Sequence, residues 1–97
     1  MDIKVGLVED KPFLAGELEK WISGAKGLKC VGVFSTAEIA LQTLPKIQTD
    51  VMVVDLRLPG MSGVEFIQKL KVMLPQIQCL VLTMYSESNL IFEALQA

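Results

Sequence analysis

The stretch Val51–Gly63, VMVVDLRLPGMSG, decides the fold of this chain. Apolar residues lead straight into Asp55, and a Pro-Gly pair and a second glycine then interrupt regular structure before helical spacing begins at Val64. An apolar run without polar alternation is typical of a strand buried on both faces of a parallel sheet. Asp55 is therefore predicted at the carboxyl end of such a strand, where the loops of open α/β sheets form binding crevices.

A second strand pattern also ends in acidic residues. The apolar segment 3–8 is followed directly by Glu9 and Asp10. Because neighbouring parallel strands end at the same edge of a sheet, their carboxylates are expected to meet that of Asp55. A lone aspartate after a strand is often only a helix cap or turn former. The acid pair makes that simpler explanation much weaker.

Strand and helix patterns alternate along the whole chain, which predicts a parallel sheet with helices on both faces. We expect further strands at 28–34 and 78–83. Helices are expected at 12–24 and at 64–74. Another helix should run from a cap at Ser35 or Thr36 to Pro45, and a last one should follow a cap at Ser86. Glu38, three residues after Ser35, favours a capping box. Phe13 and Trp21 belong to the apolar stripe of their helix and are expected to be core or helix-face residues.

Composition excludes several classes of protein. With 97 residues, of which 52% are hydrophobic, the chain has room for one domain. A formal charge of −2 without a Lys/Arg cluster gives no electrostatic surface for nucleic acid. Cys30 and Cys79 lack metal-binding spacing and are expected to be buried thiols in a reducing compartment. Without a signal peptide or an apolar run of membrane-spanning length, the protein is expected to be cytoplasmic and to contact no membrane.

Carboxylates converging at strand ends have a definite chemical meaning. They cannot all stay ionised unless a cation joins them or one keeps its proton. Oxygen ligands without histidine or cysteine favour Mg²⁺, which is usually held by one or two carboxylates, waters and a phosphate oxygen. Thr83 is expected at the same edge, where its hydroxyl could donate to such a phosphate.

These residues resemble the receiver domain of two-component response regulators over the whole chain. The resemblance rests on Glu9 and Asp10 after the first strand, Asp55 in D-x-R-L-P-G-M-S-G, and Thr83 after the fourth strand. The sequence of the segment VVDLRLPGMSGVEF is most similar to the NarL/FixJ branch of this family. The resemblance implies a flavodoxin-like (CheY-like) doubly wound parallel sheet with the strand order 2-1-3-4. The family's fifth strand and fifth helix would be missing, so residues 1–97 would form a C-terminally truncated receiver domain.

The resemblance also implies a role for each matching residue. Asp55 would accept a phosphoryl group from a sensor histidine kinase. Glu9, Asp10, Asp55 and the backbone carbonyl of Arg57 would hold Mg²⁺, which offsets charge repulsion during the transfer. Thr83 would be the switch hydroxyl. DNA binding would belong to a C-terminal output domain missing from this chain, and no turnover of a separate substrate is expected.

Two features depart from the family pattern. The phosphoryl-contacting lysine of the family lies at the end of the fifth strand, and none of Lys46, Lys69 and Lys71 is placed to substitute for it. The 97 residues alone are therefore expected to be poor at phosphotransfer. Met84 is bulkier than the alanine often found after the switch hydroxyl. An exposed fourth strand and an uncovered sheet face around Val53 and Leu80 are further expected to make the chain self-associate.

Alternatives to a phosphoacceptor domain are open at this stage. A phosphorylation-independent interaction module would keep the same sheet but bind neither Mg²⁺ nor phosphate. The strand before Asp55 also fits a Walker B element, but the chain contains no GxxxxGK[ST] loop. An enzyme acting on a small molecule is a distant third, because no separate acid and base pair is present.

Overall fold

The structure is a computed structural model that describes residues 2–82, and within them strands and helices alternate as predicted. The elements are β1 (Ile3–Val8), α1 (Pro12–Gly24), β2 (Leu28–Phe34), α2 (Ala37–Thr43), the 3₁₀ turn η1 (Leu44–Lys46), β3 (Val51–Asp55), α3 (Gly63–Met73) and β4 (Gln78–Leu82). The predicted switch hydroxyl of Thr83, Met84 and the helix expected after Ser86 lie outside the described residues.

The strands form a parallel sheet in the order β2-β1-β3-β4, as predicted. In the register of β1 and β3, Val8 lies opposite Val54. The segment that leaves β1 and the last residue of β3 are therefore level at the carboxyl edge of the sheet. This register brings the acid pair after β1 to Asp55.

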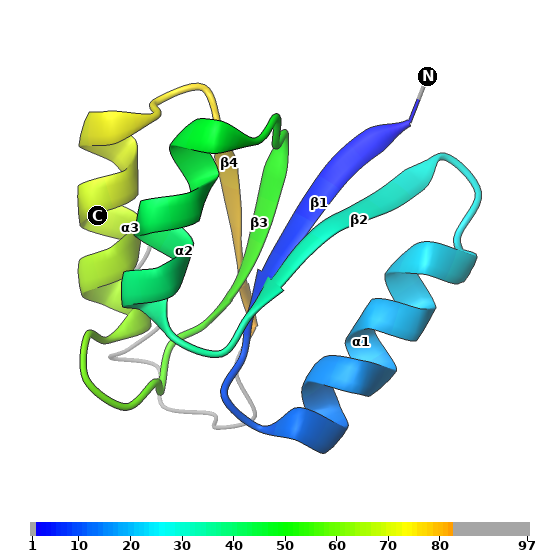
Figure 1. Cartoon of the computed structure of the whole chain (residues 1–97), viewed down its shortest axis with the longest axis horizontal. Coiled ribbons are helices and arrows are strands. Elements are labelled where there is room, and N and C mark those ends of the chain that lie inside the picture. Colours follow the sequence, from blue (N-terminus) through cyan, green and yellow to red (C-terminus); the bar gives the residue numbers. More distant parts are fainter. Residues whose placement is uncertain (1, 83–97) are drawn as a thin grey trace.

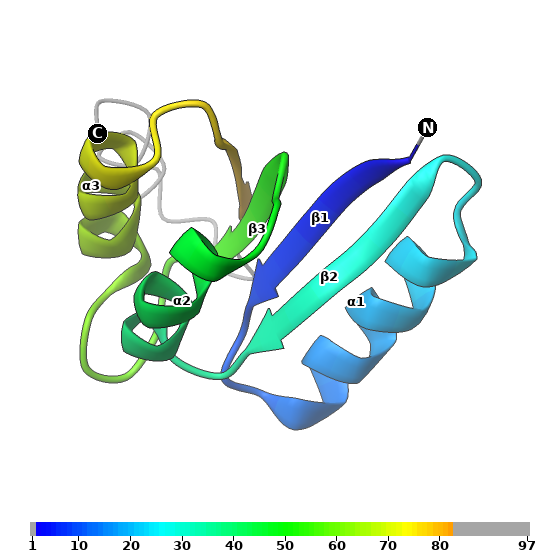
Figure 2. The ribbon, with the colours of Figure 1, turned by 45° about the horizontal axis from the view of Figure 1, so that its top comes forward.

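Helices cover both faces of the sheet, but unequally. Figures 1 and 2 show α1 on one face and α2 and α3 together on the other. The main core lies beneath α2 and α3, where Met52 and Val54 of β3 meet Phe66 and Leu70 of α3, all of them fully or almost fully buried. Most of the packing of the sheet is therefore on the side of α2 and α3, and the loop after β3 leads to α3 on that side.

The prediction that β3 is buried on both faces is wrong in part. Met52 and Val54 are buried, but Val51 and Val53, which point to the other face, are only half-buried. On that face a hollow of about 460 Å³ is lined only by apolar residues: Ile3, Val5, Trp21, Ile22, Ala25, Leu28, Val51, Val53 and Leu80. The expected uncovered area around Val53 and Leu80 is confirmed for the described residues.

Of the two positions expected for Phe13 and Trp21, in the core or on the face of their helix, the core is excluded. Their exposed fractions are 82% and 78%. Helix α1 instead buries the smaller side chains Ala15 and Ile22. An apolar stripe on a helix shows that a face can be buried, but not how much of it meets a neighbouring element.

Helix ends follow the sequence signals with one correction. Pro12 is the first residue of α1, as predicted. The cap of α2 is Thr36, whose hydroxyl accepts a hydrogen bond from the amide of Ile39 at 3.2 Å, so the capping box built on Ser35 is wrong. Ser62 caps α3 in the same way, through the amide of Glu65.

The two cysteines are less buried than the sequence predicts. Cys30 and Cys79 are free thiols, but they are half-buried and not fully buried, and burial raises the pKa of both. Among the helices between residues 2 and 82, none has the length and hydropathy needed to span a membrane.

Candidate metal and phosphoacceptor site

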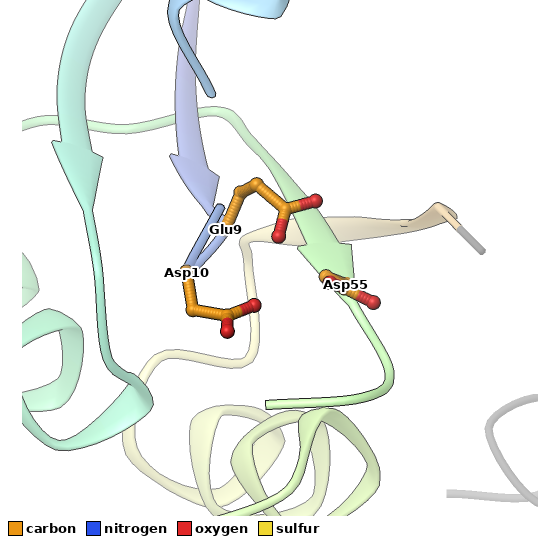
Figure 3. A group of neighbouring side chains, drawn as sticks. All are labelled: Glu9, Asp10 and Asp55. Carbon is orange, nitrogen blue, oxygen red and sulfur yellow. The ribbon is translucent and has the colours of Figure 1, made fainter. Parts of the chain in front are cut away.

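Three carboxyl groups converge at the carboxyl edge of the sheet. Glu9 and Asp10 follow β1, and Asp55 is the last residue of β3 (Figure 3). One carboxylate oxygen from each lies within 4.8 Å of the others. The convergence predicted from the sequence is therefore present, and it follows from the parallel pairing of β1 with β3.

Burial and hydrogen bonds fix two of these groups firmly. Glu9 is 2% exposed and Asp55 is 5% exposed. Asp55 Oδ1 accepts a hydrogen bond from the amide of Arg57 at 3.0 Å, and Glu9 Oε2 accepts one from the amide of Lys11 at 3.2 Å. Each carboxylate is thus oriented by the backbone amide two residues further along the chain.

Other oxygens of the cluster lack hydrogen-bond partners. Within residues 2–82, Glu9 Oε1 and Asp10 Oδ1 are buried and accept no hydrogen bond. Burial is the main cause that raises the pKa of Glu9 to about 7, and a hydrogen bond shared with Asp55 and the negative charge of Asp55 add to it. Without a metal ion, a proton on Glu9 would relieve the repulsion within the cluster.

The donor set fits Mg²⁺. All three side chains offer hard oxygen ligands, and the two orphaned oxygens are of the kind that a cation satisfies. Polar atoms buried without partners are costly unless a ligand or water joins them. A divalent cation would therefore satisfy both these oxygens and the charge repulsion at once.

Sequence reasoning missed a charged residue at this site. The Lys11 ammonium lies 3.9 Å from Asp55 Oδ2 and 4.0 Å from Asp10 Oδ1. The sequence predicts Lys46, Lys69 and Lys71 to lie away from the cluster, and it assigns Lys11 only to the opening of the helix at Pro12. The signal was the position of Lys11 itself, directly after the acid pair and before Pro12.

The loop after β3 is held against the site by close backbone packing. The amide of Gly63 donates to the carbonyl of Leu56 at 3.1 Å. Glu38 at the start of α2 reaches across to the loop, where its Oε2 accepts a hydrogen bond from the amide of Met61 at 3.3 Å. Gly60 has a φ of +73°, a left-handed conformation that favours glycine.

Comparison with known proteins identifies the class. The chain belongs to the response regulator receiver domain family, which it matches over residues 5–97. Receiver domains are signalling modules, and this chain is such a domain by sequence and by fold. The predicted family and the predicted CheY-like sheet are both confirmed.

Relatives with named functions come from several bacteria. The DNA-binding transcriptional activator DevR/DosR of Mycobacterium tuberculosis is 30% identical over 95 residues, which cover 98% of this chain and 44% of the relative. Response regulator protein VraR of Staphylococcus aureus is 30% identical over 97 residues, which cover 100% of this chain and 46% of the relative. A protein-glutamate methylesterase/protein-glutamine glutaminase of Burkholderia thailandensis is 33% identical over 73 residues, which cover 75% of this chain and 21% of the relative. The chain spans less than half the length of each.

Solved structures share the fold. The isolated REC domain of RcsB from Salmonella enterica serovar Typhimurium, in the presence of the phosphomimetic BeF₃⁻, superimposes with a TM-score of 0.91 at 24% identity. The match covers 99% of this chain and 72% of that one. The RcsB–DNA complex gives a TM-score of 0.92 at 24% identity, with 99% and 49% covered.

Proposed function

We propose that Asp55 is the phosphoacceptor of this receiver domain. The observation that carries the proposal is the meeting of the Asp55 carboxylate with Glu9 and Asp10, all within 4.8 Å, in a cluster that has orphaned oxygens. The family membership of the chain supports the same reaction. Among the three acids, Asp55 is the one that ends the central strand β3.

The proposed reaction is transfer from a phosphohistidine of a sensor histidine kinase. A carboxylate oxygen of Asp55 attacks phosphorus, a P–O bond forms, the P–N bond breaks, and the imidazole leaves with a proton from solvent. The amide of Arg57 holds Asp55 Oδ1 throughout and so fixes the orientation of the nucleophile. Burial of Asp55 leaves few water molecules to compete for the incoming phosphoryl group.

Mg²⁺ is the proposed cofactor of this transfer. Glu9, Asp10, Asp55 and the backbone carbonyl of Arg57 would hold it. When bound, it offsets the charge repulsion between the carboxylates and the phosphoryl group. Glu9 and Asp10 contribute through their oxygens that lack hydrogen bonds within the described chain.

The switch and the partners are also proposals. Thr83 directly follows β4, and we assign its hydroxyl to sensing of the phosphoryl group on the strength of the family resemblance. Residues 1–97 are proposed to act as the receiver unit of a longer transcriptional regulator, in which a separate domain binds DNA. The names of DevR/DosR and of the RcsB–DNA complex support that output. Structures of RcsB dimers on DNA support self-association.

Incorporation of phosphate tests the proposed function. The chain is incubated with acetyl phosphate and Mg²⁺, and the phosphorylated fraction is measured by intact mass. Wild type and Asp50→Asn should incorporate phosphate, because Asp50 lies at the opposite edge of the sheet, before β3. Asp55→Asn and EDTA-treated wild type should not. Equal incorporation by Asp55→Asn would overturn the assignment, and no Mg²⁺ binding by wild type would favour a phosphorylation-independent interaction module.

A further inference from the structure

Lys11 places a positive charge beside the carboxylate cluster, and neither the family pattern nor the proposed reaction uses it. Its ammonium lies 3.9 Å from Asp55 Oδ2 and 4.0 Å from Asp10 Oδ1. It therefore approaches carboxylates from two different strand ends. These distances are those of loose ion pairs and are longer than hydrogen bonds.

The backbone of Lys11 is fixed although its side chain is mobile in principle. Its amide donates to Glu9 Oε2 at 3.2 Å, and the following Pro12 restricts Lys11 to the extended conformation in which it is found, with φ −87° and ψ 113°. The side chain is 48% exposed. The ammonium is thus tethered to the cluster and can also move into solvent on its flexible stem.

Charge and position make Lys11 and a divalent cation competitors. The two partners of the ammonium are Asp10 Oδ1 and Asp55. Asp10 Oδ1 is buried without a hydrogen bond, and Asp55 belongs to the group of carboxylates that could hold a metal ion. A divalent cation placed among these oxygens would be repelled by an ammonium at this range. Both cations relieve the same repulsion, so each makes the other less necessary.

We propose that Lys11 is a built-in counter-ion of the metal-free site, which holds the carboxylates together and must move away when Mg²⁺ binds. The inference rests on the proposed Mg²⁺ site. Its consequence is regulatory, because Lys11 weakens Mg²⁺ binding and so raises the Mg²⁺ concentration at which Asp55 becomes competent. The site is stable without metal at the cost of metal affinity.

Calorimetric titration with Mg²⁺ at pH 8 tests the proposal on four proteins. Lys11→Met keeps most of the aliphatic stem and removes the charge, and it should bind Mg²⁺ about threefold to tenfold more tightly than wild type. Lys11→Arg keeps the charge and should bind like wild type. Lys26→Met removes the same charge from the exposed turn after α1 and should also bind like wild type. Equal or weaker binding by Lys11→Met would overturn the proposal.

Thermal melting in EDTA at low ionic strength provides a readout without metal. Lys11→Met should melt at a lower temperature than Lys26→Met, and saturating Mg²⁺ should remove the difference. An unchanged difference would contradict the counter-ion role.

The two assignments fail in distinguishable ways. If wild type binds Mg²⁺ and Asp10→Asn abolishes binding, while Lys11→Met matches wild type, only the role of Lys11 is refuted. If wild type itself shows no binding that depends on Asp10, the metal site and the role of Lys11 are refuted together.

Discussion

Gly63, the first residue of α3, lies directly against the backbone carbonyl of Asp55. A Cβ atom at Gly63 would collide with that carbonyl oxygen and would lie 2.7 Å from the Cα of Leu56. The start of α3 is therefore pressed onto the chain that leaves β3. This contact sets how the loop turns back over the carboxylate, and it admits no side chain.

Replacing Gly63 should destabilise the fold. Gly63→Ala forces backbone atoms apart, and we expect it to lower the free energy of unfolding by about 3 kcal/mol, the upper range for overpacking. Gly16→Ala is the matched control, since nothing lies within 4 Å of its Cβ position and alanine favours the helix. It should raise the free energy of unfolding by about 0.5–1 kcal/mol. Urea denaturation of both variants makes the measurement, and similar values for the two would refute the steric account.

Stability of the metal-free chain should depend on the proton held by Glu9. Its pKa is about 7 in the folded state against a reference value of 4.5, so the folded state binds this proton more tightly. The stabilisation is fully present below about pH 4.5 and is lost as pH rises through 7. At about 1.4 kcal/mol for each pKa unit, the loss is on the order of 3 kcal/mol.

The pH effect is measured by urea denaturation in EDTA between pH 5 and pH 8. Glu9→Gln cannot titrate and should flatten this part of the profile. Other carboxyl groups add their own slope, so the comparison with Glu9→Gln isolates the effect. A wild-type profile that rises with pH in parallel with that of Glu9→Gln would show that Glu9 keeps no proton.

Glu38 should restrain the loop that passes over the site. Its carboxylate accepts the hydrogen bond of the Met61 amide, and Glu38→Ala removes it. Amide hydrogen exchange at Met61 should become faster, by about tenfold if the bond contributes about 1.4 kcal/mol. Glu17→Ala is the control, because Glu17 pairs only with the nearby Lys20 among the ion pairs of the described chain. Unchanged exchange at Met61 would mean that the loop is held by other contacts.

Self-association should depend on the apolar surface around β4. Among the described strands, β4 forms one edge of the sheet, and Leu80 on it is 61% exposed beside the hollow that Trp21 also lines. Leu80→Lys should therefore reduce association in light scattering at micromolar concentration. Val72→Lys changes an equally apolar residue, 84% exposed on α3, and should have no effect. A wild type that stays monomeric would refute the prediction.

Much of the fold follows from local patterns in the sequence. The unbroken apolar run before Asp55 and the proline at the start of α1 placed strands and a helix within a residue or two of their observed ends. Parallel pairing then brought Glu9 and Asp10 to Asp55. Each of these steps depends on chain order and on residue type, which a sequence contains directly.

The errors concern contacts that a linear pattern does not determine. Trp21 carries helical spacing like Ile22, but Trp21 is 78% exposed and Ile22 only 7%, because burial depends on which elements lie opposite. Ser35 and Thr36 are both residue types that cap helices, and in the structure Thr36 is the cap. Lys11 was missed because residues adjacent in sequence were compared by motif and not by the direction in which their side chains extend.

The position of the phosphoryl group tests the central claim most directly. The 97-residue chain is phosphorylated with acetyl phosphate and Mg²⁺, the acyl phosphate is trapped by reduction, and the modified residue is located by peptide mass spectrometry. We expect the label on Asp55 alone, and none on any residue of Asp55→Asn. A label on Glu9, Asp10 or any other residue of the wild-type chain would contradict the account.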